Sequence, residues 1–415
     1  MERNEIIELC KKVRESSYTI AKLTTKEKNE LLKNIQKNLI NSREKIMAQN
    51  QIDISNGEKK GLNKAMLDRL LLTEKRFTEM VNGINEIINL PDPVYEMSDF
   101  IRRPSNIIVG RMRVPIGVIG IIYEARPNVT VDAAVLCIKA GNSVILRGGS
   151  ESYNSNIAII EAMKNALKEM KLNEYIISYL MTPAREAIDV MLEQEEYIDL
   201  IIPRGGEGLI RHVVEKSKIP VLKHYKGVCH IYVEEDYNFD DAIRIIRNAK
   251  LQRPAVCNAV EKVLVHKNIA EKFLPILSEK LKEVELRGCE ISCKILPQIK
   301  KATEEDWYAE YLDLILTIKV VNNLDEAIAH INKYSSKHTD SILTNNYQKG
   351  MQFLKEVDSS TVLINASTRF SDGGQFGLGA EIGISTDKLH ARGPMGLKEL
   401  TTQKFIVFGN GEIRE

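Results

Sequence analysis

The chain has 415 residues, of which 43% are hydrophobic and 28% are charged. This composition is typical of a globular protein, and the length allows two or three domains with a large core. Its 58 Lys and Arg residues balance 57 Asp and Glu residues, so a net charge of +1 provides no overall field to attract nucleic acid or an anionic membrane.

Targeting and metal-binding signals are weak in this sequence. No apolar run approaches the roughly 20 residues of a membrane span, and the charged start MERNEIIELCKKVRE lacks the apolar centre of a signal peptide. Six scattered cysteines in a chain of this size indicate reduced thiols, so we expect a cytoplasmic protein. Cys289 and Cys293 have ligand-like spacing, but no histidine or further cysteine pair lies near them in sequence, and we expect no metal site.

The first 90 residues are predicted to be helical. Thr24 and Glu27 have the spacing of a capping box, in which each residue bonds the backbone N–H of the other. The apolar residues that follow recur on one helical face: Leu31, Leu32, Ile35, Leu39 and Ile40.

From Arg111 onward, short apolar strands alternate with helices. The predicted strands are 118–123, 143–147 and 198–202, and the predicted helices are 130–139, 152–170 and 207–216. This alternation is typical of a parallel, doubly wound α/β sheet. Right-handed crossovers would bring the strand ends and their loops together along one edge.

A second alternating series begins near His230 and predicts another α/β domain. Its strands are expected at 230–233, 261–266, 314–321, 340–343 and 361–364, with helices at 239–250 and 325–334. The following glycine-rich stretch contains interleaved apolar residues, which favour a packed, irregular segment over a disordered one.

Cys257 lies in the run QRPAVCNAV, between a proline and the strand expected at 261–266. A thiol on such a loop can act as a nucleophile that substrate reaches. The alternative is a small buried hydrophobic residue, which is the commoner fate of a lone cysteine.

Two glycine-containing turns, LRGGS (146–150) and IPRGGEG (202–208), lie where strands run into helices. Glycines allow a pyrophosphate to approach the backbone, and a helix N-terminus supplies N–H donors. Neither turn matches G-x-G-x-x-G or a P-loop, so tight turns without a ligand remain the alternative. The arginines in both turns favour phosphate binding. The candidate cofactor residues are Arg147, Gly148, Ser150, Pro203, Arg204, Gly205 and Gly206.

Two further side chains have a functional and an ordinary interpretation. Asn128 follows a proline and precedes a helix, so its amide could serve as an N-cap, as a donor to an oxyanion, or as both. Glu310 could bind the hydroxyls of a ribose, and otherwise it would be a solvated surface carboxylate.

Three segments carry a resemblance to a known family: EARPNVTVDAAVLCIKAGNSVILRGGSES, QRPAVCNA and NASTRFSDGGQFGLGAEIGISTDKLHARGPMG. They are similar to the gamma-glutamyl phosphate reductase family of the aldehyde dehydrogenase superfamily, and the similarity runs essentially end to end. The resemblance implies that Cys257 is the nucleophile and that Asn128 is the oxyanion amide. It also places Arg147 beside the adenine ribose and Glu310 at the nicotinamide ribose.

The same resemblance implies an aldehyde-dehydrogenase-like fold with two doubly wound parallel-sheet domains and a small β arm. Residues 1–98 and 115–226 would form the NADP-binding domain, and 227–365 the catalytic domain. Residues 99–114 and 395–415 would form the oligomerisation arm, expected as a two-stranded ribbon. Residues 366–394 would be a glycine-rich segment near the active site.

One departure from the superfamily bears on the reaction. Hydrolytic aldehyde dehydrogenases carry a Glu-Leu-Gly-Gly run whose glutamate activates water. The corresponding stretch here is KHYKGVCH (223–230), with no carboxylate before Gly227. Its absence favours exchange of a thioester with phosphate over hydrolysis.

The expected reaction is therefore the NADPH-dependent reduction of L-glutamyl 5-phosphate to L-glutamate 5-semialdehyde and phosphate, in proline biosynthesis. Arg147 with Ser150 favours NADPH over NADH. Arg126, Thr368 and Arg369 are candidates for binding the anionic groups of the substrate, with structural ion pairs or turns as the alternative. The alternatives for the whole chain are an oxidative aldehyde dehydrogenase acting on another small semialdehyde, and a non-catalytic scaffold with the same fold.

The expected partners are a small-molecule substrate and further copies of the chain, in a dimer or larger homo-oligomer. No nucleic-acid or membrane partner is expected. A glutamate 5-kinase, which would supply the acyl phosphate, is expected to be a separate protein.

Overall fold

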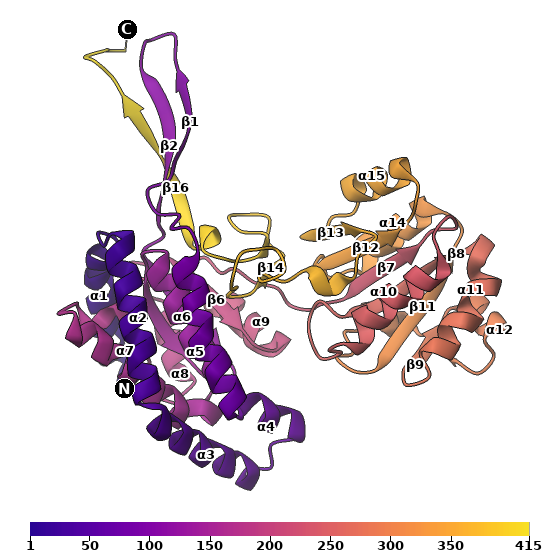
Figure 1. Cartoon of the computed structure of the whole chain (residues 1–415), viewed down its shortest axis with the longest axis horizontal. Coiled ribbons are helices and arrows are strands. Elements are labelled where there is room, and N and C mark those ends of the chain that lie inside the picture. The colour runs from indigo at the N-terminus through magenta and orange to yellow at the C-terminus, as the bar shows by residue number, and fades with distance from the viewer. Residues whose placement is uncertain (415) are drawn as a thin grey trace. The chain divides into compact units, whose positions relative to one another are not determined.

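A computed structural model describes residues 1–414 and divides them into two compact units (Figure 1). The first unit contains Met1–Lys223, Gly377–Gly383 and the residues from Met395 onward. The second unit contains His224–Phe376 and Ile384–Pro394. The glycine-rich stretch 366–394 is therefore divided between the two units.

Five helices open the first unit: α1 (Arg3–Ile20), α2 (Thr25–Asn41), α3 (Arg43–Lys59), α4 (Lys64–Leu70) and α5 (Glu74–Asn89). The predicted capping box is present at α2, where Thr24 accepts from the N–H of Glu27 and Glu27 accepts from the N–H of Thr24. Four residues of the expected apolar face are buried, but Ile40 is exposed and lies outside that face.

The sheet of the first unit has four parallel strands in the order β5 (Ile177–Tyr179), β4 (Ser143–Arg147), β3 (Val118–Tyr123) and β6 (Leu200–Arg204). Its further helices are α6 (Pro127–Lys139), α7 (Tyr153–Glu169), α8 (Glu186–Leu192) and α9 (Glu207–Lys216). Helices α1, α8 and α9 share an apolar core with one face of the sheet, and α2 and α5 pack on α6. Strand β6 begins two residues later than predicted, so Pro203 and Arg204 belong to the strand.

A three-stranded antiparallel sheet projects from the same unit (Figure 1). It consists of β1 (Met97–Arg102), β2 (Ile108–Pro115) and β16 (Thr401–Phe408), with β2 in the centre. The prediction of two strands was wrong, because residues 97–102 turn back and pair with β2. A third strand makes such a ribbon more stable than a lone hairpin.

The second unit has a seven-stranded parallel sheet. Its order is β10 (Lys300–Lys301), β9 (Glu285–Gly288), β11 (Ile315–Val321), β8 (Val260–His266), β7 (Cys229–Val233), β12 (Thr339–Leu343) and β13 (Thr361–Ile364). Alternation along β7 directs Ile231 and Val233 to the core under α10 (Phe239–Leu251) and α11 (Lys267–Lys280). Tyr232 faces the opposite core, formed with α14 (Leu324–Tyr334) and α15 (Tyr347–Glu356).

The prediction of two doubly wound parallel sheets with a small β arm is confirmed. Helices α8, α11 and α15 were not predicted from the sequence, and neither were the short helices α12 (Glu290–Ile295) and α13 (Glu304–Tyr308). Helix α11 contains Pro275, a residue that normally argues against a helix interior. The glycine-rich stretch is packed, with Ile382 and Ile384 buried and with the short strands β14 (Ile384–Ser385) and β15 (Gly393–Pro394) paired. Across residues 1–414, no helix has both the length and the apolar character that crossing a membrane requires.

Candidate active site

Cys257 lies in a turn between α10 and β8, as the sequence predicts. The N–H of Ala259 donates to the carbonyl of Val256 over 3.0 Å, which closes the turn around the thiol. The residue is half-buried and not in a disulfide. A thiol in this position is close to solvent but anchored to a central strand of the sheet.

Two residues of the preceding strand region hold the backbone of Cys257. Gly227 lies so close that a Cβ on it would be 1.9 Å from the carbonyl oxygen of Cys257. The thiol of Cys229 donates to that same carbonyl over 3.2 Å. Burial raises the pKa of Cys229 well above its usual value, so this thiol stays protonated and acts as a donor.

Arg369 bonds residues on both sides of Cys257. Its Nε donates to Gln252 Oε1 over 2.9 Å, and its Nη1 donates to Asn258 Oδ1. Burial lowers the pKa of Arg369, while the charges of Asp372 and Cys257 act to raise it. The guanidinium therefore lies within electrostatic range of the thiol and braces the turn that carries it.

Thr368, the neighbour of Arg369, is fully buried in the short helical turn Thr368–Phe370. Its hydroxyl has no hydrogen-bond partner within residues 1–414. An unpaired buried hydroxyl is costly, so it needs a reason such as a ligand or an ordered water.

Glu310 is half-buried and is not the solvated surface carboxylate of the ordinary interpretation. Its Oε1 accepts the N–H of Gly227 over 2.9 Å. Glu310 and Cys257 thus contact the same glycine, although they are far apart in the sequence.

Asn128 belongs to the first unit and does not cap α6. Arg126, which is exposed, occupies the N-cap position, Pro127 follows as the first helical residue, and Asn128 is the second. Its Nδ2 donates to Asp132 Oδ2, one turn further along, over 3.0 Å. Burial raises the pKa of Asp132 to about 6, while the bond from Asn128 and the charge of Arg204 act to lower it.

Arg147 is nearly buried at the end of β4, with 7% of its surface exposed. It donates from Nη1 to the carbonyl of Gly148 over 2.9 Å and from Nη2 to the carbonyl of Pro183 over 3.0 Å. Its Nε is buried without a hydrogen-bond partner among the residues described. Burial lowers the pKa of Arg147, and nearby Tyr179 and Glu151 partly offset this effect.

The glycines of the two turns are explained in part by contacts within the protein. A Cβ on Gly148 would lie 2.1 Å from the amide nitrogen of Asn156, and one on Gly205 would lie 2.7 Å from the carboxyl carbon of Glu124. Gly206 occupies the N-cap position of α9 and has no side chain that could accept from the first backbone N–H groups of that helix.

The candidate residues lie at the carboxyl ends of the strands in the first unit and at the amino ends of the strands in the second. In the first unit, Asn128, Ser150 and Gly205 follow the carboxyl ends of β3, β4 and β6. In the second unit, Cys257 and Glu310 precede the amino ends of β8 and β11. The usual preference for carboxyl ends holds only for the first sheet.

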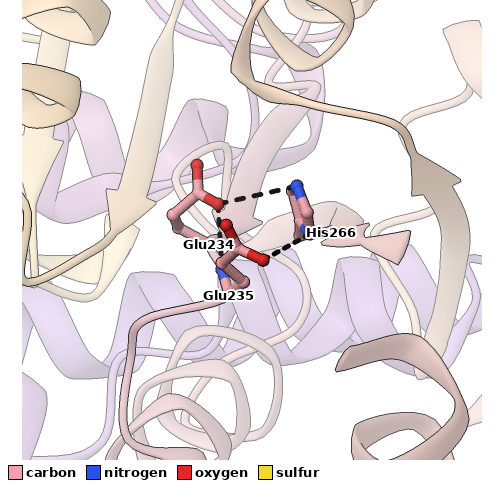
Figure 2. Close-up of side chains that lie close together, drawn as sticks. All are labelled: Glu234, Glu235 and His266. Carbon is pink, nitrogen blue, oxygen red and sulfur yellow. Dashed lines mark hydrogen bonds and ion pairs between the residues drawn. The ribbon is translucent and has the colours of Figure 1, made fainter. Parts of the chain in front are cut away.

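At the carboxyl ends of β7 and β8, Glu234, Glu235 and His266 converge (Figure 2). His266 Nδ1 accepts the N–H of Asn268 over 3.2 Å, and its Nε2 lies 3.8 Å from Glu234 Oε1. Lys349 Nζ lies 3.1 Å from Glu234 Oε1 and already neutralises it. The carboxylate of Glu234 is thus already paired with a cation of α15.

Three residues of the site were not predicted from the sequence: Asp132, Cys229 and Asn258. Of these, Asp132 could have been found, because it lies four residues after Asn128 on the same face of the helix. Glu261 and Lys262, two charged residues at the start of a strand that is fully buried, were not predicted either.

Comparisons with known proteins agree with this architecture. A model of the aldehyde dehydrogenase family matches residues 1–314. The gamma-glutamyl phosphate reductase of Thermodesulfovibrio yellowstonii is 58% identical over 412 residues, covering 99% of each chain. The crystal structure of gamma-glutamyl phosphate reductase from Thermotoga maritima superposes with a TM-score of 0.97 at 49% identity, covering 99% of this chain and 100% of that one.

A more distant structure shares the fold alone. It is glyceraldehyde-3-phosphate dehydrogenase GapN from Methanocaldococcus jannaschii in complex with NADP, with a TM-score of 0.69, 17% identity and coverage of 99% of this chain and 95% of that one. The family model and the full-length similarity to the reductases lead to one conclusion: this chain belongs to the aldehyde dehydrogenase family, within the group of the gamma-glutamyl phosphate reductases.

Proposed function

We propose that this protein reduces L-glutamyl 5-phosphate to L-glutamate 5-semialdehyde and phosphate with NADPH, in proline biosynthesis, through a thioester on Cys257. The observation that carries the proposal is 58% identity over 99% of the chain to a gamma-glutamyl phosphate reductase. The half-buried thiol in its closed turn supports the covalent step.

In the first step, the thiolate of Cys257 attacks the acyl carbon, a C–S bond forms and the C–O bond to phosphate breaks. Phosphate leaves with the bonding electron pair and needs little acid assistance. We assign the side-chain amide of Asn128 and the backbone N–H of Cys257 to the tetrahedral oxyanion. Loss of one such donor costs about 10²–10³ in rate. The Nδ2 of Asn128 has a second hydrogen available while it donates the first to Asp132.

Arg369 has two roles in this step. As a cation beside the turn it favours the thiolate, because a nearby positive charge stabilises the ionised form. Through Gln252 and Asn258 it also fixes the segment on either side of the thiol. Arg369 also remains a proposed contact of the substrate's anionic groups, together with Thr368, whose hydroxyl is buried and unpaired among the residues described, and the exposed Arg126.

A nicotinamide, when bound, would supply hydride to the thioester. In the resulting thiohemiacetal oxyanion on Cys257 the C=O bond re-forms and the C–S bond breaks, so the sulfur leaves with the electron pair as thiolate and the aldehyde is released. Glu310, on a loop beside the thiol-bearing turn, is assigned to the nicotinamide ribose. We assign a group of residues to the adenosine and phosphate end: Arg147, Gly148, Ser150, Pro203, Arg204, Gly205 and Gly206. In support, α9 begins at Gly206 without a side-chain cap, and the Nε of Arg147 is buried with no hydrogen-bond partner among the residues described. The preference for NADPH rests on Arg147 with Ser150.

The absence of a general base for water supports phosphate as the partner of the thioester. Residues 223–226 contain no carboxylate, and Gly227 presses directly on the backbone of Cys257. A thioester that water attacks slowly survives long enough to exchange with phosphate or to accept hydride.

We also propose that the chain forms a homo-oligomer through its β arm. Phe405 and Phe408 on β16, with Phe100 on β1, are exposed on this arm. The rings of Phe100 and Phe408 lie 6.0 Å apart. Exposed aromatic side chains on a thin sheet are typical of an interface with another subunit.

The test runs the reaction backward with glutamate 5-semialdehyde and NADP. Reduction of NADP should require inorganic phosphate and should be lost in Cys257→Ala, which should also fail to complement a proline auxotroph. Turnover without phosphate would instead identify an oxidative aldehyde dehydrogenase, and complementation by Cys257→Ala would identify a non-catalytic scaffold.

A further inference from the structure

The segment Ala309–Leu312, which carries Glu310, is bound near both ends by two consecutive residues of β8. Lys262 Nζ donates to the carbonyl of Ala309 over 2.8 Å, and its ammonium lies 4.4 Å from the centroid of the Tyr311 ring. On the other side of Glu310, the N–H of Leu312 donates to Glu261 Oε1 over 3.3 Å. The two residues thus hold the segment from both directions.

Burying these charged side chains is unfavourable in free energy. Glu261 pairs with Lys250 of α10 over 2.9 Å, and both side chains have 0% of their surface exposed. Burial raises the pKa of Glu261 to about 7 and lowers that of Lys262 to about 7. Desolvating such ions costs several kcal/mol each, and apolar residues of the same volume would often stabilise a core better. Apolar side chains would pack this strand equally well, so the buried charges require another explanation.

The segment that they hold lies close to the turn that carries the thiol. The clamped segment directs the carboxylate of Glu310 at the N–H of Gly227, 2.9 Å away. Gly227 in turn touches the backbone of Cys257. All of these contacts lie within the second unit, so they do not depend on how the two units are arranged.

We propose that Lys262 and Glu261 are positioning residues that hold Glu310 in place for the cofactor ribose. This inference rests on the ribose role assigned to Glu310 in the proposed function. Lys250 completes the arrangement by holding Glu261, so that one oxygen of its carboxylate faces Leu312. The buried charges fix the segment Ala309–Leu312, which apolar side chains at these positions would leave free to shift.

The test compares Lys262→Met, which keeps the stem and removes the donor, with Lys262→Gln, which keeps a shorter donor. The control is Lys272→Met on α11, where the lysine is exposed. For Lys262→Met, kcat/KM for NADP in the phosphate-dependent reverse reaction should fall about tenfold, the equivalent of about 1.4 kcal/mol. Lys262→Gln should lose less, and Lys272→Met should be unchanged. Alkylation of Cys257 by iodoacetamide, which needs no cofactor, should stay within about twofold in all three.

A double-mutant cycle with Glu310→Gln separates this inference from the proposed function. If Lys262 acts through Glu310, Lys262→Met adds little further loss in the Glu310→Gln background. Equal losses in alkylation and in kcat/KM for NADP, or full additivity with Glu310→Gln, would overturn the positioning role. Normal NADP kinetics in Glu310→Gln alone would instead overturn the ribose assignment.

Discussion

Gly227 lies against Cys257 so closely that no side chain fits between them. A Cβ on this glycine would be 1.9 Å from the carbonyl oxygen of Cys257 and 2.5 Å from its Cα. We expect Gly227→Ala to displace the turn that carries the thiol and to lower kcat at least 100-fold, by misplacing the nucleophile.

Gly83→Ala is the matched control for this substitution. Gly83 lies within α5, and a Cβ on it would meet nothing within 4 Å. This variant should keep its activity and gain up to about 1 kcal/mol in the free energy of unfolding, because alanine favours helix over glycine. Steady-state kinetics and urea denaturation measure the two effects, and wild-type kcat in Gly227→Ala would contradict the expectation.

The cysteines should differ sharply in reactivity. Burial raises the pKa of Cys10 to about 12 and also raises that of Cys137 and of Cys229. Brief treatment of the native protein with iodoacetamide should label Cys257 and spare these three, because only the thiolate reacts. Mass spectrometry of the digested protein locates the label, and labelling of Cys229 ahead of Cys257 would count against the proposed nucleophile.

Replacing Arg369 by methionine should slow the alkylation of Cys257 about tenfold at pH 7, the equivalent of about 1.4 kcal/mol. The variant removes the cation beside the thiol together with its bonds to Gln252 and Asn258. Arg244→Met is the control, since Arg244 is an exposed arginine of α10 that pairs only locally with Asp241. An unchanged rate in Arg369→Met would show that Arg369 does not assist the thiolate.

Asp132 should make the stability of the protein depend on pH. Its pKa in the folded state is raised to about 6, chiefly by burial, from 3.8. The stabilisation from this group is therefore fully present below about pH 3.8 and is lost as the pH rises through 6. Relative to Asp132→Asn, which keeps an acceptor for Asn128 but cannot ionise, the wild type should become less stable between pH 4 and pH 7. Urea denaturation at each pH tests this, and a constant difference would exclude a raised pKa.

The exposed aromatics of the arm should control the size of the assembly. Replacing both Phe405 and Phe408 by glutamate places charges on side chains that are 66% and 53% exposed. Light scattering should report a dimer or larger assembly for the wild type and a monomer for this variant, because buried unpaired charges oppose association. Tyr347→Glu, on α15 of the second unit, should leave the mass unchanged, and a wild-type monomer would contradict the proposal.

Local sequence patterns were enough to predict much of the secondary structure. The period of the apolar residues predicted most strands of both sheets, and the helices α7, α9, α10 and α14, to within two residues, since burial on one or two faces follows directly from side-chain periodicity. The capping box at Thr24 and the loop position of Cys257 were equally local, because each depends on residues within a few positions of one another.

Only the tertiary structure showed which residues that are far apart in the sequence come into contact. Gly227 meets Glu310 across 83 positions, and Arg369 meets Asn258 across 111. Long crossover connections bring these residues together at the amino ends of β8 and β11, and periodicity does not say which end of a strand will carry a site. Asn128 likewise proved to be inside α6 because Arg126, one residue before Pro127, takes the capping position. The sequence identified the candidate nucleophile, and only the tertiary structure showed which neighbours hold it.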